Sequence, residues 1–329
     1  MPTPTARLLA ELETAGLLPP AQAAAIAEDE RTRPFSLHYE LRALLYLGIT
    51  LLAGGVGVLI YQHIDSIGHG VIIGAITLAM SASFTYAVRH LGPFTWGEAP
   101  RTSIAADYLL VLSCLLFLVL EGYLQVQYQL FGTRYKLTTV LPAGLFFGLA
   151  YRFDHRGVLS MAITALAAWV GVSVAPLKMF NDSNFLWYAL SRLALLLGLA
   201  LVAAGLSSEL LNRKRHFAFT YLSLGSNVAL LATMNLLFDA GKGQGFGWLL
   251  LVLALSAGLV WYARRTQSYL FLLMSVAYSY VAITYGIVTV LAGDHSGNWI
   301  MAMIMLYLPL TLIGIVLLFI NIKKILRLA

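Results

Sequence analysis

Ten apolar stretches of about twenty residues constrain this chain more than any other feature. A helix of roughly 20 apolar residues crosses the hydrocarbon core of a bilayer, about 30 Å. Only 11% of the residues are charged and 60% are hydrophobic, whereas soluble domains carry about 25% charged residues. We therefore predict an all-α, polytopic transmembrane bundle of about ten spans. The spans are expected near 41–62, 69–89, 106–131, 137–152, 156–176, 186–208, 216–239, 245–263, 268–292 and 299–320.

Lysine and arginine in the loops predict the orientation. If the N-terminus is inside, sixteen of the 21 cations lie in inner segments and four lie in outer loops. This bias follows the positive-inside rule and places both termini in the cytoplasm. The inner cations are Arg7, Arg31, Arg33, Arg42, Arg89, Arg101, Arg152, Arg156, Arg213, Lys214, Arg215, Arg264, Arg265, Lys323, Lys324 and Arg327. The outer ones are Arg134, Lys136, Lys178 and Lys242.

The transmembrane domain, 41–329, divides into two similar halves, 41–176 and 186–320, with five predicted spans each. An odd number of spans per half would make the halves inverted repeats, as in many transporters. The sequence echo is short: Leu45-Tyr46 near the start of one half and Trp187-Tyr188 near the start of the other. Equal halves also arise by chance, so both interpretations stay open.

Residues 1–40 predict a cytoplasmic helical hairpin. Leucines form an apolar face on the first helix, which Gly16 ends, and Pro19-Pro20 opens a second helix from Ala21 to about Glu30, because proline suits a helix start. The segment is acidic and proline-containing, unlike a signal peptide. It is either a leader that lies on the inner loops or, within residues 1–35, a docking site for a protein partner.

Residues from Leu8 to about Tyr86 carry a recognisable order of features. A leucine-rich helix is followed by Gly16-Leu17-Leu18, a second short helix, a first span containing Gly54-Gly55-Val56-Gly57, and an outer loop with Asp65. This order resembles a bacterial family of predicted membrane proteins of unknown function. The family usually has an Asn-Trp-Asp-like sequence in the outer loop, where this chain has Gln62-His63 before Asp65. The resemblance implies a multi-pass protein of the bacterial inner membrane and no activity.

Glu121 and Arg192 are the two charged residues expected inside spans. Ionisable residues at such depth are costly and are candidates for function. Counted at 1.5 Å per residue, both lie roughly 9–15 Å below the outer surface, so we predict that they form an ion pair. The pair would either lock two helices together or form a substrate or proton site.

Three polar helix faces and one proline complete the candidate site. Polar faces in a membrane either form hydrogen bonds between helices or line a cavity, and a proline inside a span predicts a kink that can act as a hinge. The face beginning at Glu121 continues through Gln125, Tyr128 and Gln129. The other candidates are Ser223 and Asn227 on 216–239, Tyr278 and Tyr285 on 268–292, and Pro309 within 299–320.

No cofactor, metal site or nucleic-acid partner is predicted. The single cysteine, Cys114, excludes an internal disulfide and a cysteine-based metal site. Imidazoles and carboxylates at His63, Asp65, His69, Asp294 and His295 suit divalent ions, but rim loops are polar in any case. The chain has no phosphate-binding glycine loop and no metalloprotease motif, and its net charge of +6 is explained by the inner loops.

Three hypotheses of function remain. The first is a transporter or permease for a small solute, with an outward-facing polar cavity and a proton or solute site at Glu121 and Arg192. The second is a non-catalytic scaffold or sensor that acts through its N-terminal helices. The third is a membrane-embedded hydrolase that uses the outer histidines and aspartates, and an enzyme is the less favoured class. In each case the lipid bilayer is the expected environment.

Overall fold

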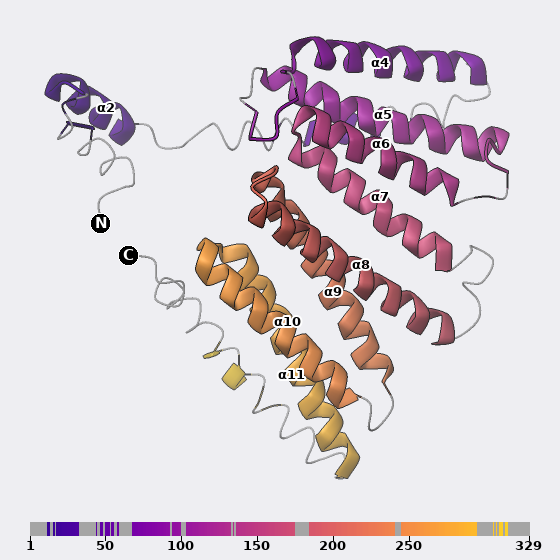
Figure 1. Ribbon diagram of the computed structural model, residues 1–329, viewed down its shortest axis with the longest axis vertical. Helices are drawn as coiled ribbons and strands as arrows, with labels where there is room; N and C mark the ends of the chain where they lie inside the picture. The colour runs from indigo at the N-terminus through magenta and orange to yellow at the C-terminus, as the bar shows by residue number, and fades with distance from the viewer. Residues whose placement is uncertain are drawn as a thin grey trace. The chain divides into compact units, whose positions relative to one another are not determined.

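The computed structural model describes residues 18–32, 68–92, 94–99, 103–132, 134, 136–174, 184–240 and 245–294, with separate positions between 12 and 16, 44 and 58, and 305 and 314. The chain divides into two compact units, Met1–Gly74 and Ala75–Ala329. Helices are the regular elements throughout these described residues (Figure 1). The predicted all-α class is therefore confirmed.

The first unit contains helix α2, Pro20–Thr32. The carbonyl of Pro19 accepts hydrogen bonds from the backbone N–H groups of Gln22 (2.9 Å) and Ala23 (3.0 Å), and proline at the first helical position has no N–H to leave unpaired. Gly16 adopts a left-handed φ of 68°, a conformation that suits a glycine at the end of a helix. The second helix predicted for the N-terminal segment is therefore present.

The second unit begins inside α4, which the unit boundary divides after Gly74. Its helices follow one another along the chain with short connections. They are α4 (His69–His90), α5 (Ile104–Tyr128), α6 (Leu137–Phe153), α7 (Arg156–Val174), α8 (Asn184–Leu210), the short 3-10 helix η2 (Arg215–Phe217), α9 (Ala218–Asp239), α10 (Gly245–Thr266) and α11 (Tyr269–Asp294).

Seven helices among the described residues are long and apolar enough to cross a membrane. They are α4, α5 and α7 to α11, while α6 is shorter, with 17 residues and Pro142 inside it. Each of the eight stretches predicted between 69 and 292 coincides with one of these helices. The predicted first and tenth spans, 41–62 and 299–320, lie mostly outside the described residues, so the count of ten stays a prediction.

Helix α9 lies at the centre of this packing. In α9, 61% of the residues in the most hydrophobic 18-residue stretch are buried, whereas this share is 17–28% in the other six long helices. Those helices leave large apolar side chains exposed, including Val126 (84%) and Leu196 (62%). Contiguous exposed apolar surface is unfavourable in water, so these faces fit a lipid environment.

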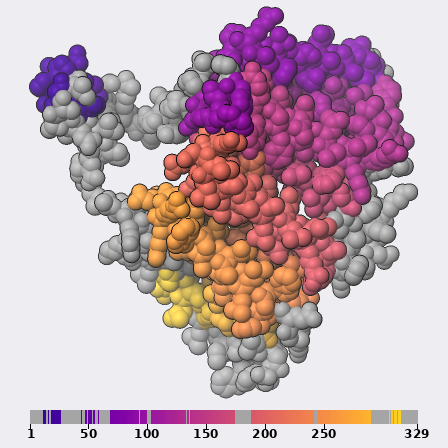
Figure 2. Space-filling view, in the orientation of Figure 1, coloured from indigo at the N-terminus to yellow at the C-terminus, as the bar shows by residue number. Residues whose placement is uncertain are grey.

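Glycines allow α8 and α9 to approach closely. A Cβ atom on Gly198 would lie 2.5 Å from the backbone nitrogen of Ala229, and one on Gly225 would lie 2.8 Å from the Cβ atom of Leu201. Small residues at such crossings replace side-chain bulk with backbone contact. α10 and α11 pack beside this pair, as Figure 2 shows by the orange surface next to the red one.

Candidate functional site

Glu121 lies on the buried face of α5. Leu110, Cys114, Glu121 and Gln125 are all buried and share this face, because residues three, four or seven apart align on a helix. The Glu121 side chain is 6% exposed, and its Oε1 atom has no hydrogen-bond partner within the described structure. A buried carboxyl oxygen without a partner is rare and costly.

The ring of Phe117 sets the level of Glu121 relative to the next helix. It contacts Phe146 of α6 edge-on, with ring centroids 6.1 Å apart. α5 and α6 are consecutive helices joined by a short turn and are therefore antiparallel. Glu121 lies four residues after Phe117 and Pro142 lies four residues before Phe146, so Glu121 and Pro142 are at the same level along the two helices.

The predicted ion pair between Glu121 and Arg192 is wrong. The Arg192 guanidinium is exposed, donates a 2.9 Å hydrogen bond to the Tyr188 hydroxyl one turn earlier, and lies 4.4 Å from the centre of that ring. The described ion pairs do not include one between Arg192 and Glu121. α5 packs on α6 and α7, whereas α8 packs mainly on α9, so equal depth does not bring the two side chains together.

Gln125 holds the turn that follows α5. Its Nε2 donates to the carbonyl of Gly132 and its Oε1 accepts from the N–H of Phe131, both at 3.0 Å. The helix ends at Tyr128, which is 54% exposed, and Gln129 takes a left-handed φ of 50°. The predicted polar face is therefore shorter than expected, because Gln129 does not continue the helix and Tyr128 is not buried with Glu121 and Gln125.

The predicted polar residues of α9 and α11 make hydrogen bonds, and two of these bonds join the two helices. The Tyr278 hydroxyl donates to Asn227 Oδ1 at 2.7 Å, and the Tyr285 hydroxyl donates to the Phe238 carbonyl at 3.2 Å. Ser223 Oγ donates to the carbonyl of Thr220 within α9. The two interhelical bonds hold α9 and α11 together in the way expected of polar groups in membranes. Asn227 therefore lies against α11, whereas α5, which carries Glu121, packs on α6 and α7.

Pro309 is helical and exposed. Two residues near it bond to α11: Thr284 Oγ1 lies 3.0 Å from the Tyr307 hydroxyl, and the Tyr280 hydroxyl lies 3.3 Å from Thr311 Oγ1. The kink and the hinge role of Pro309 stay predictions. Of the outer imidazoles and carboxylates, His63, Asp65 and His295 lie outside the described residues. Within the described residues, no group of three histidine, cysteine, aspartate or glutamate side chains is placed to hold a metal ion.

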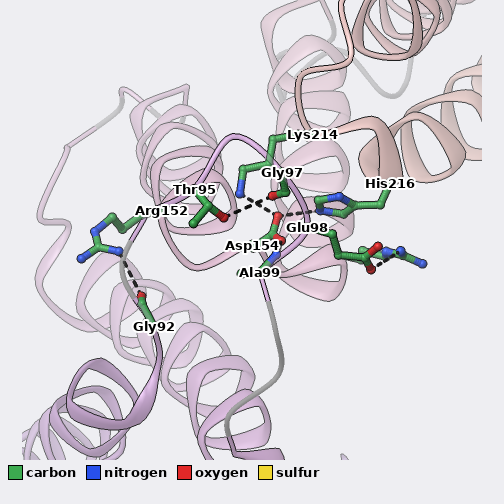
Figure 3. A network of polar contacts seen from close by, with 10 residues as sticks. Gly92, Thr95, Gly97, Glu98, Ala99, Arg152, Asp154, Lys214 and His216 are labelled. Atoms are coloured by element: carbon green, nitrogen blue, oxygen red, sulfur yellow. Dashed lines mark hydrogen bonds and ion pairs between the residues drawn. The ribbon is translucent and has the colours of Figure 1, made fainter.

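A buried ionic cluster, which the sequence reasoning missed, connects three loops at one end of the helices (Figure 3). Asp154, directly after α6, lies between Lys214 and His216 from the connection between α8 and α9. Its Oδ1 is 2.8 Å from Lys214 Nζ and 2.5 Å from His216 Nε2, and its Oδ2 accepts a 2.7 Å hydrogen bond from the N–H of Ala99. The Lys214 side chain is only 1% exposed.

The local backbone places these groups. Asp154 and Lys214 both adopt left-handed conformations, with φ of 58° and 51°, which are uncommon for residues other than glycine. The N–H of Lys214 donates to the carbonyl of Trp96 at 2.9 Å, and its ammonium lies 5.3 Å from the centre of the Phe94 ring. Three loops, 94–99, 154–156 and 213–217, are thus connected by one lysine and one aspartate.

Electrostatics in the cluster favour the ionised carboxylate of Asp154. Burial would raise its pKa, but the Ala99 hydrogen bond, the Lys214 hydrogen bond and the charges of His216 and Lys214 together lower the pKa below its ordinary value. A second, exposed ion pair joins Arg156 to Glu98 at 2.9 Å. Asp154 and Glu98 are acidic residues in loops that also carry arginine or lysine, a pattern that does not by itself indicate a buried cluster.

The arrangement of the helices defines a class of protein. Seven long apolar helices among the described residues, a central helix buried by its neighbours, and apolar outer faces are the features of a polytopic membrane protein. Residues 10–159 match a family described as predicted membrane protein (DUF2157), whose function is unknown. This match confirms the family resemblance and implies contact with the lipid bilayer. No curated protein and no solved structure matches the chain.

Proposed function

We propose that this protein is a proton-coupled transporter of a small solute, with the Glu121 carboxyl as its proton-binding group. The observation that carries the proposal is the buried Oε1 atom of Glu121, which has no hydrogen-bond partner in the described structure. An ionised carboxylate in a low-dielectric interior needs a counter-ion or becomes neutral. With Arg192 engaged by Tyr188, the charge of Glu121 is free to be compensated by a proton or by a cationic group of a solute.

The coupling follows from this requirement. In its protonated form Glu121 is compatible with the apolar face formed by Leu110 and Cys114. When it loses the proton, the carboxylate must meet water or a positively charged group, which requires a rearrangement of α5 against α6. An alternation between these two states is the minimum needed to couple proton movement to solute movement.

The proposed topology has about ten spans, both termini in the cytoplasm and the bacterial inner membrane as its location. The ionic cluster supports it, because the loops 94–99, 154–156 and 213–217 meet at one end of the helices, and the positive-inside rule assigns all three to the inner side. Arg265 also approaches Glu209, 3.7 Å away at the end of α8. The proposed topology also includes the five-plus-five inverted repeat of the halves 41–176 and 186–320.

Labelling with a hydrophobic carbodiimide tests whether Glu121 is protonated, because the reagent modifies protonated carboxyl groups in apolar surroundings. We expect mass spectrometry of the labelled wild-type protein to find the adduct on Glu121. Asp107, in the first turn of the same helix, is the matched control and should stay unlabelled. Labelling of Asp107 alone would contradict the assignment.

Transport itself is tested in proteoliposomes. Proton-driven currents are recorded on solid-supported membranes across a panel of small solutes, for the wild type, Glu121→Gln and Asp107→Asn. We expect Glu121→Gln to abolish the solute-dependent currents and Asp107→Asn to keep them. A folded Glu121→Gln protein with wild-type currents would overturn the proposed role of Glu121.

A non-catalytic scaffold or sensor is the second candidate. The separation of Met1–Gly74 as its own compact unit favours it, as does Ile26 of α2, which is 44% exposed. In this case residues 1–35 would bind a protein partner. Deleting them should remove that partner from a pull-down while the carbodiimide labelling of Glu121 stays unchanged, and an unchanged set of partners would exclude this role.

A further inference from the structure

An apolar groove runs between α8 and α10, with α9 as its floor. The cavity in it has a volume of about 260 Å³, and its lining is almost entirely aliphatic and aromatic. Val202 and Leu206 of α8 form one wall, Leu222 and Leu230 of α9 form the floor, and Gly258 of α10 lies on the other wall. α8 and α10 each pack on α9, and the groove lies between them.

Both ends of the groove are bounded. Toward the loops that carry the arginines, the Tyr262 hydroxyl of α10 donates to Glu209 Oε2 of α8 at 3.1 Å, and Arg265 approaches the same carboxylate at 3.7 Å. Toward the opposite end, Leu195 of α8 and Leu255 of α10 belong to one hydrophobic cluster built on α9. The groove is therefore limited in length, with a polar end at Glu209, Tyr262 and Arg265 and an apolar end at Leu195 and Leu255.

Positive charge exceeds negative charge at that polar end. Arg264 and Arg265 lie in the last turn of α10. Arg265 and Arg215 both lie close enough to Tyr262 for their charges to interact with its hydroxyl. The carboxylate of Glu209 lies among these cations, and it accepts a hydrogen bond from Tyr262 and pairs with Arg265. Trp261 is 62% exposed beside the groove, with the Arg265 guanidinium 5.8 Å from its ring centre, an arrangement typical of the lipid headgroup region.

We propose that this groove is a binding site for an anionic phospholipid. One acyl chain lies between α8 and α10 on α9, and the phosphate lies at Arg265 and Arg215. Aliphatic lining selects a hydrocarbon chain, and basic pockets between helices on the cytoplasmic side select anionic headgroups.

The headgroup part is tested by lipid retention. Delipidated wild-type protein is incubated with phosphatidylglycerol or phosphatidylcholine, and native mass spectrometry counts the lipids kept. We expect retention of one phosphatidylglycerol and a loss of about fivefold in its affinity for each of Arg265→Gln and Arg215→Gln, from the contribution of one cation near a membrane surface. Arg89→Gln, at the end of α4, removes the same charge elsewhere and should have no effect.

The acyl-chain part is tested by filling the groove. A Cβ atom on Gly258 would have nothing within 4 Å, so Gly258→Leu adds bulk inside the groove without a clash against the backbone. We expect it to reduce phosphatidylglycerol retention at least fivefold while thermal unfolding in detergent stays near that of the wild type. Gly171→Ala on α7, also with open space around its Cβ position, is the control for substitution of a helical glycine.

Four outcomes would overturn the site. Equal retention of phosphatidylcholine would mean that the headgroup is not selected, and full retention by Gly258→Leu would mean that the chain lies elsewhere. Stabilisation by inorganic phosphate alone, to the level reached with phosphatidylglycerol, would mean that the arginines bind free phosphate. A dimer of this chain that Gly258→Leu dissociates would mean that a second copy occupies the groove.

Discussion

The carboxylate of Asp154 and the ammonium of Lys214 lie 2.8 Å apart, although 60 residues separate them along the chain. Both side chains are almost completely buried, and each belongs to a different connection between helices. The pair therefore closes a long loop of the chain at the end where the arginine-rich segments meet. Removing one partner of a buried pair leaves an uncompensated charge and costs far more than removing an exposed one.

The first prediction concerns Lys214→Met. Because Asp154 keeps its charge without its lysine, the free energy of unfolding should fall by about 3–5 kcal/mol. Arg156→Gln is the control, since it breaks the exposed ion pair with Glu98 and should cost less than about 1 kcal/mol. Denaturant unfolding in detergent micelles measures both. In a double-mutant cycle with Asp154→Asn, additive effects would show that the two groups are not coupled.

Acid should remove the contribution of Asp154. Its pKa is lowered in the folded protein relative to the ordinary value of 3.8, so its stabilisation is fully present above that value and is lost as the pH falls through the lower folded-state pKa. Lys214 Nζ and His216 Nε2 both face the carboxylate. The stability difference between wild type and Asp154→Asn should therefore be constant from pH 6 to pH 5 and shrink below about pH 4. A difference that grows in acid would contradict the assigned direction.

Contact between α8 and α9 should be sensitive to a single methyl group. In Gly198→Ala the new Cβ atom would lie 2.5 Å from the backbone nitrogen of Ala229, so the helices must separate, at an expected cost of about 1–3 kcal/mol. Gly171→Ala has open space around its Cβ position and should be neutral or stabilising, because alanine favours helix more than glycine does. Thermal unfolding compares them, and equal midpoints would argue against the close approach.

Tyr278→Phe should weaken the contact between α9 and α11. It removes the hydroxyl that donates to Asn227 at 2.7 Å, and hydrogen bonds between membrane helices contribute about 0.6 kcal/mol on average, up to about 1.7. Tyr269→Phe at the exposed start of the same helix is the matched control. If Tyr278 instead contacts a transported solute, the variant will change the currents of proteoliposomes more than it changes stability.

The sequence predicted which polar residues matter in the candidate site, but it did not predict which residues they contact. Asn227, Ser223, Tyr278 and Tyr285 were recognised from polar positions repeating on helical faces, and all four make hydrogen bonds. The pairing of Glu121 with Arg192 was not correct, because depth along a helix is readable from span boundaries while the rotation of each helix and its neighbours is not. Arg192 turns to Tyr188 on its own helix, a contact within one turn.

The cluster around Asp154 shows the same limit. A loop aspartate, a loop lysine and a loop histidine are unremarkable in a sequence whose inner loops are basic. Their burial depends on the left-handed turns at Asp154 and Lys214 and on the loop 94–99, which covers them. None of these contacts has a local signature, since they join residues about 55 to 62 positions apart.

The sequence by itself determined the membrane environment and eight helices from residue 69 to residue 294. The length of an apolar stretch is a property of one segment, and that length decides whether a helix can cross the bilayer. It also placed Glu121 inside a span. Only the tertiary structure decided that Glu121 keeps no ionic partner among the described residues, that Asp154 joins Lys214 and His216, and that α8 and α10 leave a groove over α9. These outcomes depend on how the helices rotate and pack against one another. The hydropathy of one segment does not specify its rotation or its neighbours.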